Sequence, residues 1–170
     1  MIRIVALEEF DPKELAKFRD GLYTAFGVGC EYSGTVAVPS GFSEPYDAPR
    51  LLPALPKVPA YQDDKTLYLT AKKLKERELP TGKAPTQGYA LFGKDRALLS
   101  LAGTPGLGEG LKVVSRYAMH QLGRLWELHH CLDPRCAMYP PWTPSFAAGE
   151  ASFDNFCRER SEQKIRLAKS

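Results

Sequence analysis

The chain has 170 residues, which suits a single domain with one sizeable core. Hydrophobic residues make up 44% and charged residues 25%, an ordinary balance for a globular protein that argues against intrinsic disorder. The net charge of only +3, with lysine and arginine spread along the chain, indicates no nucleic-acid partner, and the apolar stretches are too short to span a membrane.

The first third of the chain predicts two strands around one helix. Residues 2–7 suit a strand, and they turn acidic too soon for a signal peptide, so a reducing, cytoplasmic compartment is expected. Asp11 and Pro12 suit the cap and the first turn of a helix, whose apolar residues recur at helical spacing until Gly27 ends it. Residues 35–38 predict the second strand.

The middle of the chain predicts a loop followed by three strands. Residues 39–61 are rich in proline and show little periodicity, so an ordered or semi-ordered loop is expected. Residues 66–70 predict a third strand. Residues 89–92 and 97–101 predict a fourth and a fifth, joined by the turn at 93–96 into a hairpin.

The last sixty residues predict a helix, a loop-rich stretch and a charged helical end. The first helix runs from about residue 111 to 128 with one apolar face. The charged segment at 158–169 is the second helical candidate. Cys30 lies far from this part and is expected in the core. The remaining cysteines and all the histidines lie here: His120, His129, His130, Cys131, Cys136 and Cys157.

These histidines fit the frame of a zinc-peptidase motif. In the H-E-x-x-H peptidases, two histidines four residues apart on a helix bind one zinc, and the glutamate between them is the general base. The metzincin extension adds a helix-ending glycine, a third histidine and a methionine turn. His120 opens this frame, His130 holds the third histidine position, and Met138 holds the methionine position.

From His130 the sequence continues as His-Cys-x4-Cys-x-Met, through Cys131 and Cys136 to Met138. This run resembles the archaemetzincins, in which the third histidine leads directly into the same pattern and a Cys-x-x-Cys pair follows. Cys157 takes the first position of that pair. The segments Tyr46-Asp47-Ala48-Pro49-Arg50 and Gly88-Tyr89-Ala90-Leu91-Phe92-Gly93 also resemble family segments, so the resemblance covers most of the chain.

The resemblance implies an α+β, metzincin-like (zincin) fold in one domain, residues 1–170. A twisted mixed sheet with backing helices and the active-site helix at about 111–128 would form the N-terminal subdomain, 1–128. A small C-terminal subdomain, 129–170, would carry a cysteine cluster with a structural zinc.

The departures from the family pattern all fall on functional positions. Gln121 stands where the general base should be, and an amide cannot accept the proton from a zinc-bound water. Arg124 stands at the second histidine, and a guanidinium has no lone pair for a metal. Glu127 replaces the helix-ending glycine and is expected to resist a left-handed turn. Arg160 replaces the last cysteine.

Two metal sites therefore need separate interpretations. His120 and His130 are either remnants of a catalytic-zinc site or polar residues left in the cleft. Cys131, Cys136 and Cys157 either pack as buried thiols or hold a structural zinc with a substitute ligand, for which the candidates are His130, His129, Asp154 or water. Arg124 is expected to fill the space of the catalytic zinc, within reach of Glu127 or another carboxylate; the alternative is that its side chain points into solvent.

The functional hypothesis is a catalytically inactive pseudo-metalloprotease, monomeric and without a catalytic zinc. It would bind an extended peptide or protein in its vestigial cleft by pairing with the edge strand of Tyr89, Ala90, Leu91 and Phe92. The alternative is an active zinc-dependent peptidase whose metal site is rebuilt around His120 and His130.

Overall fold

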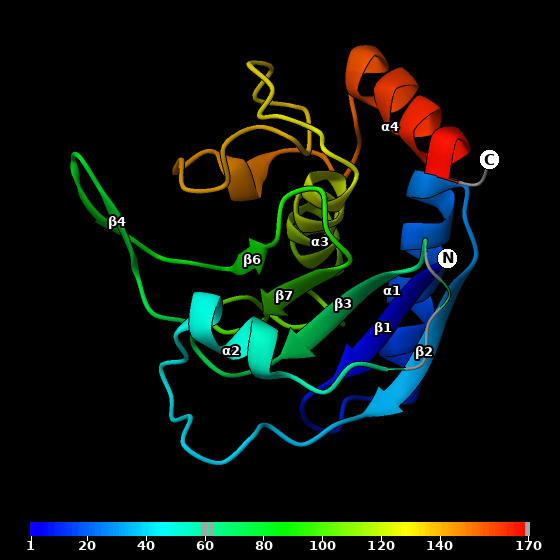
Figure 1. The fold of residues 1–170 in the computed structure, drawn as a ribbon. Coiled ribbons are helices and arrows are strands. Elements are labelled where there is room, and N and C mark those ends of the chain that lie inside the picture. Colours follow the sequence, from blue (N-terminus) through cyan, green and yellow to red (C-terminus); the bar gives the residue numbers. More distant parts are fainter. Residues whose placement is uncertain (59–60, 62, 169–170) are drawn as a thin grey trace.

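A computed structural model describes residues 1–58, 61 and 63–168 of the chain (Figure 1). Its centre is a twisted five-stranded sheet in the order β2-β1-β3-β7-β6. The first four of these strands are parallel, and only the edge strand β6 runs antiparallel, beside β7. The strands are β1 (Ile2–Ala6), β2 (Cys30–Thr35), β3 (Lys65–Thr70), β7 (Arg96–Ser100) and β6 (Gly88–Ala90).

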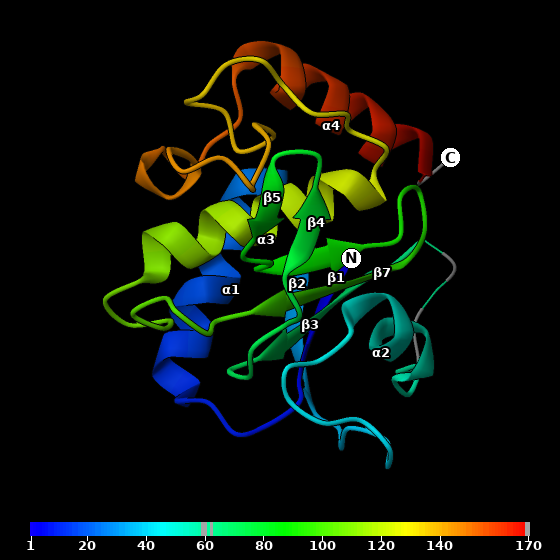
Figure 2. The same ribbon diagram turned by 90° about the vertical axis from the view of Figure 1, so that its left-hand side faces the viewer.

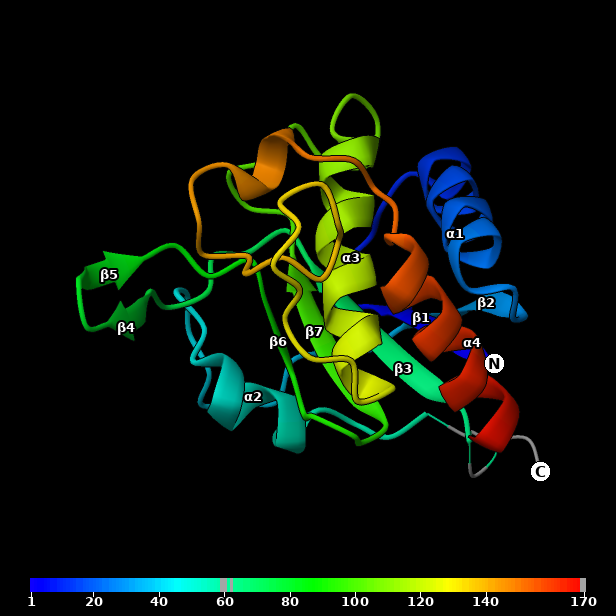
Figure 3. The ribbon, with the colours of Figure 1, turned by 90° about the horizontal axis from the view of Figure 1, so that it is seen from above.

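Helices cover both faces of the sheet, as expected for a mainly parallel sheet. Helices α1 (Pro12–Phe26) and α3 (Leu111–Leu125) lie on one face and the short α2 (Ala48–Ala54) on the other (Figures 1 and 3). Successive strand residues point to opposite faces, so Ile4 packs with α1 and α3 while Val5 packs with α2. The apolar core is thereby split into a larger and a smaller layer.

Several sequence predictions are confirmed at these elements. The side chain of Asp11 caps α1 by accepting from the backbone N–H groups of Lys13 and Glu14, and Gly27 ends it with φ of 63°. Strands β6 and β7 pair antiparallel as the predicted hairpin, with Tyr89 opposite Leu98. No helix among the described residues is long and apolar enough to cross a membrane.

Two predictions of secondary structure before β3 are wrong. The second strand lies at 30–35, not 35–38, because its pairing with β1 begins with Cys30 opposite Ile2. Cys30 is half-buried in this strand and packs against the larger core layer. The loop at 39–61, of which residues 59 and 60 lie outside the described residues, contains α2.

Helix α2 forms because the side chain of Asp47 accepts from the N–H of Arg50 while Leu51 and Leu52 are buried against the sheet. The chain between β3 and β6 forms a second hairpin, β4 (Arg77–Leu79) and β5 (Gly82–Ala84). This hairpin projects from the fold on the side of β6, and Figure 2 shows it in front of α3. Its two short strands pair with each other and not with the five-stranded sheet, so the hairpin stands out from the sheet beside β6.

The C-terminal part wraps over α3 and returns in α4 (Asn155–Ala168), which starts three residues earlier than predicted. The Asp154 carboxylate accepts from the N–H of Cys157, and its carbonyl accepts from Arg158, so Asp154 caps the helix. A one-turn 3-10 helix, η1 (Phe146–Ala148), lies in the connecting loop.

Candidate active-site cleft and cysteine cluster

The active-site helix ends at Leu125, not at 128, in a left-handed turn. Glu127 has φ of 60° and is the one non-glycine residue with positive φ among the described residues. The N–H of Leu128 donates to the carbonyl of Gly123, and that of Glu127 to Arg124. This is the paired hydrogen-bond pattern that usually closes on glycine. The expectation that Glu127 would resist the turn is therefore wrong, because the surrounding bonds stabilise it there.

The methionine turn supports the helix from below. The ring Nδ1 of the buried His120 lies 3.0 Å from the carbonyl oxygen of Ala137. Met138 is fully buried against the helix, where a Cβ on Gly123 would lie only 2.5 Å from its sulfur. When Nδ1 donates this hydrogen bond, the lone pair of the ring resides on Nε2. Both features keep His120 in one orientation.

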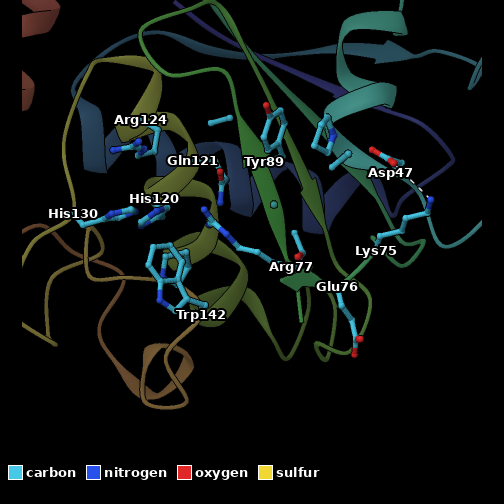
Figure 4. A pocket seen from close by; sticks show the side chains of 16 residues that line it. Asp47, Lys75, Glu76, Arg77, Tyr89, His120, Gln121, Arg124, His130 and Trp142 are labelled. Carbon is cyan, nitrogen blue, oxygen red and sulfur yellow. Dashed lines mark ion pairs between the residues drawn. The ribbon is translucent and has the colours of Figure 1, made fainter. Parts of the chain in front are cut away.

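A cleft of about 560 Å³ opens above this end of α3 (Figure 4). Edge strand β6 forms one wall, and the loop carrying Trp142 lies opposite. His120 and His130 stack with ring centroids 5.3 Å apart, and His130 meets Trp142 edge-on at 4.8 Å. The side chains that carry polar or charged groups into the cleft are Asp47, Lys75, Glu76, Arg77, Thr86, Tyr89, His120, Gln121, Arg124, His130 and Trp142.

The structure places the two replaced catalytic residues in this cleft. Gln121 folds onto Gly88 of β6, where a Cβ would lie 2.8 Å from its side chain. Arg124 lies with its guanidinium 4.3 Å from the centre of the Phe92 ring and donates from Nη1 to the carbonyl of Leu128 at 3.1 Å. Glu127 pairs with Lys164 of α4, so the predicted pairing of Arg124 with Glu127 is wrong.

The electrostatic environment of the cleft disfavours additional positive charge. The pKa of His120 is lowered to about 3 and that of His130 to about 4, mainly by burial, and the charge of Arg124 contributes to both shifts. Burial also lowers the pKa of Arg124 itself, and the neighbouring charge of Arg77 adds to this effect. Both histidines are neutral at pH 7, while the two arginines keep their charges.

A catalytic zinc does not fit these residues. A catalytic site needs three protein ligands around the metal, and the cleft offers two imidazoles, His120 and His130. Arg124 at the remaining position has no lone pair and would repel a divalent cation. Within the part of the chain that the structure describes, only one group of three or more metal-binding side chains has its donor atoms close together, and it lies elsewhere.

That group joins the three predicted cysteines with Asp154. The sulfur atoms of Cys131, Cys136 and Cys157 and a carboxylate oxygen of Asp154 lie within 4.8 Å of one another. The cap at the start of α4 turns one oxygen of Asp154 to the N–H of Cys157, and the other accepts from the Cys131 thiol at 2.8 Å. Of the three side chains considered as substitutes for the lost cysteine, Asp154 is the one whose donor atom lies in this group. Arg160, at the family's last cysteine position, lines the neighbouring hollow.

This donor set fits zinc, which binds thiolates and carboxylates in four-coordinate sites. Burial and, to a smaller extent, the hydrogen bond to Asp154 raise the pKa of Cys131 to about 11, and burial likewise raises the pKa of Cys157. Hydrogen bonds from the thiols and from the Cys157 N–H outweigh burial and lower the pKa of Asp154. The cluster can hold a zinc ion, and the thiols release protons when they bind it.

One further residue behind the cleft was missed by the sequence prediction. Arg116 of α3 is fully buried, and its guanidinium donates to four carbonyl groups of the loop that carries the cysteines. It also lies 4.5 Å from the centre of the Phe146 ring. The four acceptors belong to Pro134, Arg135, Cys136 and Glu150. No local signal separates this arginine from a surface residue, because its partners lie far along the chain.

The predicted edge strand only partly matches its expected span. Tyr89 and Ala90 lie in β6 along the cleft, whereas Leu91 and Phe92 belong to the turn that follows. His129 is exposed and lies beside Phe92, with 5.1 Å between the ring centroids, and it takes no part in the cysteine cluster.

No protein-family model matches the chain. Among characterised proteins, it is 31% identical over 155 residues to an archaemetzincin of Pyrococcus furiosus, an alignment covering 82% of this chain and 80% of that protein. The chain belongs to the archaemetzincin family. The resemblance in the His-Cys-x4-Cys-x-Met run is thereby confirmed, and the family is one of zinc metallopeptidases.

Solved structures agree with an archaemetzincin fold. The archaemetzincin of Methanopyrus kandleri matches with a TM-score of 0.76 at 20% identity, covering 97% of this chain and 94% of that one. That of Archaeoglobus fulgidus, complexed with malonate, matches with 0.74 at 19%, covering 94% and 99%. A zinc-dependent peptidase of Methanocorpusculum labreanum matches with 0.73 at 18%, covering 95% and 100%. These matches confirm the predicted metzincin-like fold.

Proposed function

We propose that this archaemetzincin is a pseudo-metalloprotease that holds no catalytic zinc and binds an extended peptide in its cleft. The observation that carries the proposal is Arg124. This residue stands at the second ligand position of the motif, its guanidinium is held by the Phe92 ring and the Leu128 carbonyl, and it cannot coordinate a metal. Gln121 removes the general base as well, a loss that alone typically lowers the rate 10²- to 10⁴-fold.

The edge of β6 supports peptide binding. Gln87 and Leu91 direct their backbone groups toward β7, as the bonds from Ser100 N–H to Gln87 and from Leu91 N–H to Arg96 show. The backbone groups of successive residues in an antiparallel strand point alternately toward the partner strand and away from it. Gly88 and Ala90 therefore direct their N–H and C=O groups toward the free edge of β6. An extended peptide can add itself there as a further strand.

Turnover of quenched fluorogenic peptide pools, with and without added zinc, tests the loss of catalysis. We expect none from the natural sequence or from Gln121→Glu alone, because Arg124 still occupies the ligand position. The double variant Gln121→Glu/Arg124→His restores both chemical functions and is the positive control for the assay. Chelator-sensitive turnover by the natural sequence, abolished in His120→Ala, would refute the proposal and favour the rebuilt metal site.

Zinc content separates the same two functions independently of any substrate. The pseudo-protease holds at most one zinc per chain, in the cysteine cluster. A rebuilt catalytic site requires a second, which His120→Ala would remove while Cys136→Ser left it in place. Metal analysis of the purified natural sequence and both variants distinguishes these outcomes.

A further inference from the structure

The cleft brings together two arginine side chains from distant parts of the chain. Arg77 reaches in from β4 and Arg124 from the end of α3, on either side of Gln121 and the histidine pair (Figure 4). Among the ion pairs of the described residues, neither guanidinium has a carboxylate partner. The cleft thus retains positive charge where the family motif would place a metal cation.

The acidic residues of the cleft do not neutralise these charges. Asp47 lies 3.6 Å from Lys75, and its carboxylate also accepts from the backbone of α2. The side chain of Glu76 points away from the floor of the cleft, as Figure 4 shows. Two cations consequently face the same space without an anion between them.

Both guanidiniums are held by aromatic rings, which leaves hydrogen-bond donors available. Arg77 lies 4.6 Å from the centre of the Trp142 ring, and Arg124 lies 4.3 Å from that of Phe92. Arg124 uses one nitrogen for the Leu128 carbonyl. Each guanidinium carries five N–H groups in a planar fork that suits the two oxygens of a carboxylate. Stacking restricts the motion of the fork before a ligand arrives.

We infer that Arg77 and Arg124 recognise a carboxylate of the extended peptide that pairs with β6. This inference rests on the proposed function and names the chemistry of its ligand. The carboxylate comes from an aspartate or glutamate side chain or from the end of a peptide chain. The amide of Gln121, beside Gly88, adds a neutral donor between the arginines and the strand edge.

A singly charged carboxylate suits this site better than a phosphate. Arg124 stands at the C-terminal end of α3, where the helix dipole is negative and the carbonyl of Leu128 already accepts one N–H. This end of the helix offers none of the free backbone N–H groups that typically bind phosphate. The positive potential of the site therefore comes from the side chains of Arg77 and Arg124 alone. Two guanidinium groups are enough to bind one carboxylate.

Isothermal titration with matched peptides tests the inference. The first probe is a seven-residue threonine–valine peptide with blocked ends and one central glutamate; its counterpart carries glutamine. A third probe has no acidic side chain but a free C-terminal carboxylate, and a fourth replaces glutamate with phosphoserine. We expect the glutamate or free-carboxylate peptide to bind at least tenfold more tightly than the glutamine peptide, and the phosphoserine peptide to gain nothing further.

Variants assign the effect to the arginines. Arg77→Gln and Arg124→Gln should each reduce the tenfold preference to less than threefold, and leave the affinity for the glutamine peptide unchanged. Lys75→Gln, at the rim and facing Asp47, is the matched control and should keep the preference. Arg77 is exposed, so its variant reports on binding even if Arg124→Gln alters the fold.

The outcomes separate this inference from the proposed function. Equal affinity for the glutamate and glutamine peptides would overturn carboxylate recognition and leave strand pairing in place. Malonate binding that is lost in Arg124→Gln, without binding of any peptide, would retain the anion site and overturn the peptide function. If no probe binds, both are wrong. If the phosphoserine peptide bound most tightly of all the probes, the inference of a carboxylate ligand would be wrong, and the ligand would be a phosphorylated peptide.

Discussion

The catalytic cleft and the cysteine cluster have each lost a ligand of the family pattern, with opposite results. In the cleft, the replacement is Arg124, a cation without a lone pair that is held against Phe92. In the cluster, Arg160 replaces a cysteine, but the carboxylate of Asp154 already stands among the three thiols. A fourth donor atom therefore lies within reach in the cluster, whereas the residue that replaces the histidine in the cleft has no lone pair for a metal.

The scaffold around the two regions is shared, because one loop contacts both of them. Arg116 ties the loop of the cysteine cluster to α3 through four carbonyl groups. The Ala137 carbonyl and Met138 of the same loop hold His120 and the end of α3. The same loop therefore shapes both the cleft and the cluster.

The largest effect should come from removing the cluster's metal. Structural zinc binding is worth about 10–16 kcal/mol in zinc-finger peptides, and part of this should stabilise the present fold. Cys136→Ser should abolish zinc binding and lower the melting temperature, and a chelator should do the same to the natural sequence. Metal analysis with thermal unfolding measures both. If the purified protein contained no zinc and a chelator did not change its melting temperature, the three thiols would only pack in the core and would not bind metal.

Arg116 should contribute to stability without metal. Arg116→Met leaves four carbonyl groups without their donor, and we expect a loss of about 3–5 kcal/mol, because each buried polar group left unpaired costs about 1–3 kcal/mol. Lys112→Met is the matched control, because this exposed residue on the same helix pairs only with Glu150. Urea unfolding of zinc-free protein measures the difference. Similar midpoints for the two variants would contradict the assigned role of Arg116.

The buried histidine of the cleft should make the fold sensitive to acid. The pKa of His120 is about 3 when folded and about 6.5 when unfolded, so the unfolded chain binds more protons between these values. Stability therefore falls as pH drops below about 6.5, by up to about 1.4 kcal/mol per unit from this residue. His120→Gln, measured without zinc, should flatten the profile between pH 6.5 and 5; an unchanged slope would refute this.

The smallest effect separates the two roles of Asp154. Asp154→Asn keeps a good helix cap but replaces an anionic ligand, so zinc should bind at least tenfold more weakly while the zinc-free stability hardly changes. Asp154→Ala also removes the cap and should cost about 1 kcal/mol more. Zinc titration and urea unfolding of the two variants supply the measurements. Unaltered zinc affinity in Asp154→Asn would exclude the carboxylate as the fourth ligand.

The sequence by itself determined the features that depend on near neighbours along the chain. Helix α1 follows from Asp11, Pro12 and Gly27, and the β6–β7 hairpin from two apolar runs around a short turn. The family resemblance pointed to a metal cluster at Cys131 and Cys136, and the family frame marked Gln121 and Arg124 as departures from the catalytic pattern. Each of these features depends on residues that lie close together along the chain, because helix capping, turn formation and hydrophobic periodicity are local effects.

Only the tertiary structure decided which distant residues meet. Helix α2 forms in a proline-rich stretch because Leu51 and Leu52 pack into the smaller core layer on that face of the sheet. Asp154 becomes the fourth donor because α4 starts at the cluster, and Arg77 enters the cleft because a short hairpin projects beside β6. The left-handed turn at Glu127 is set by bonds back to α3, which outweigh the preference of the residue itself.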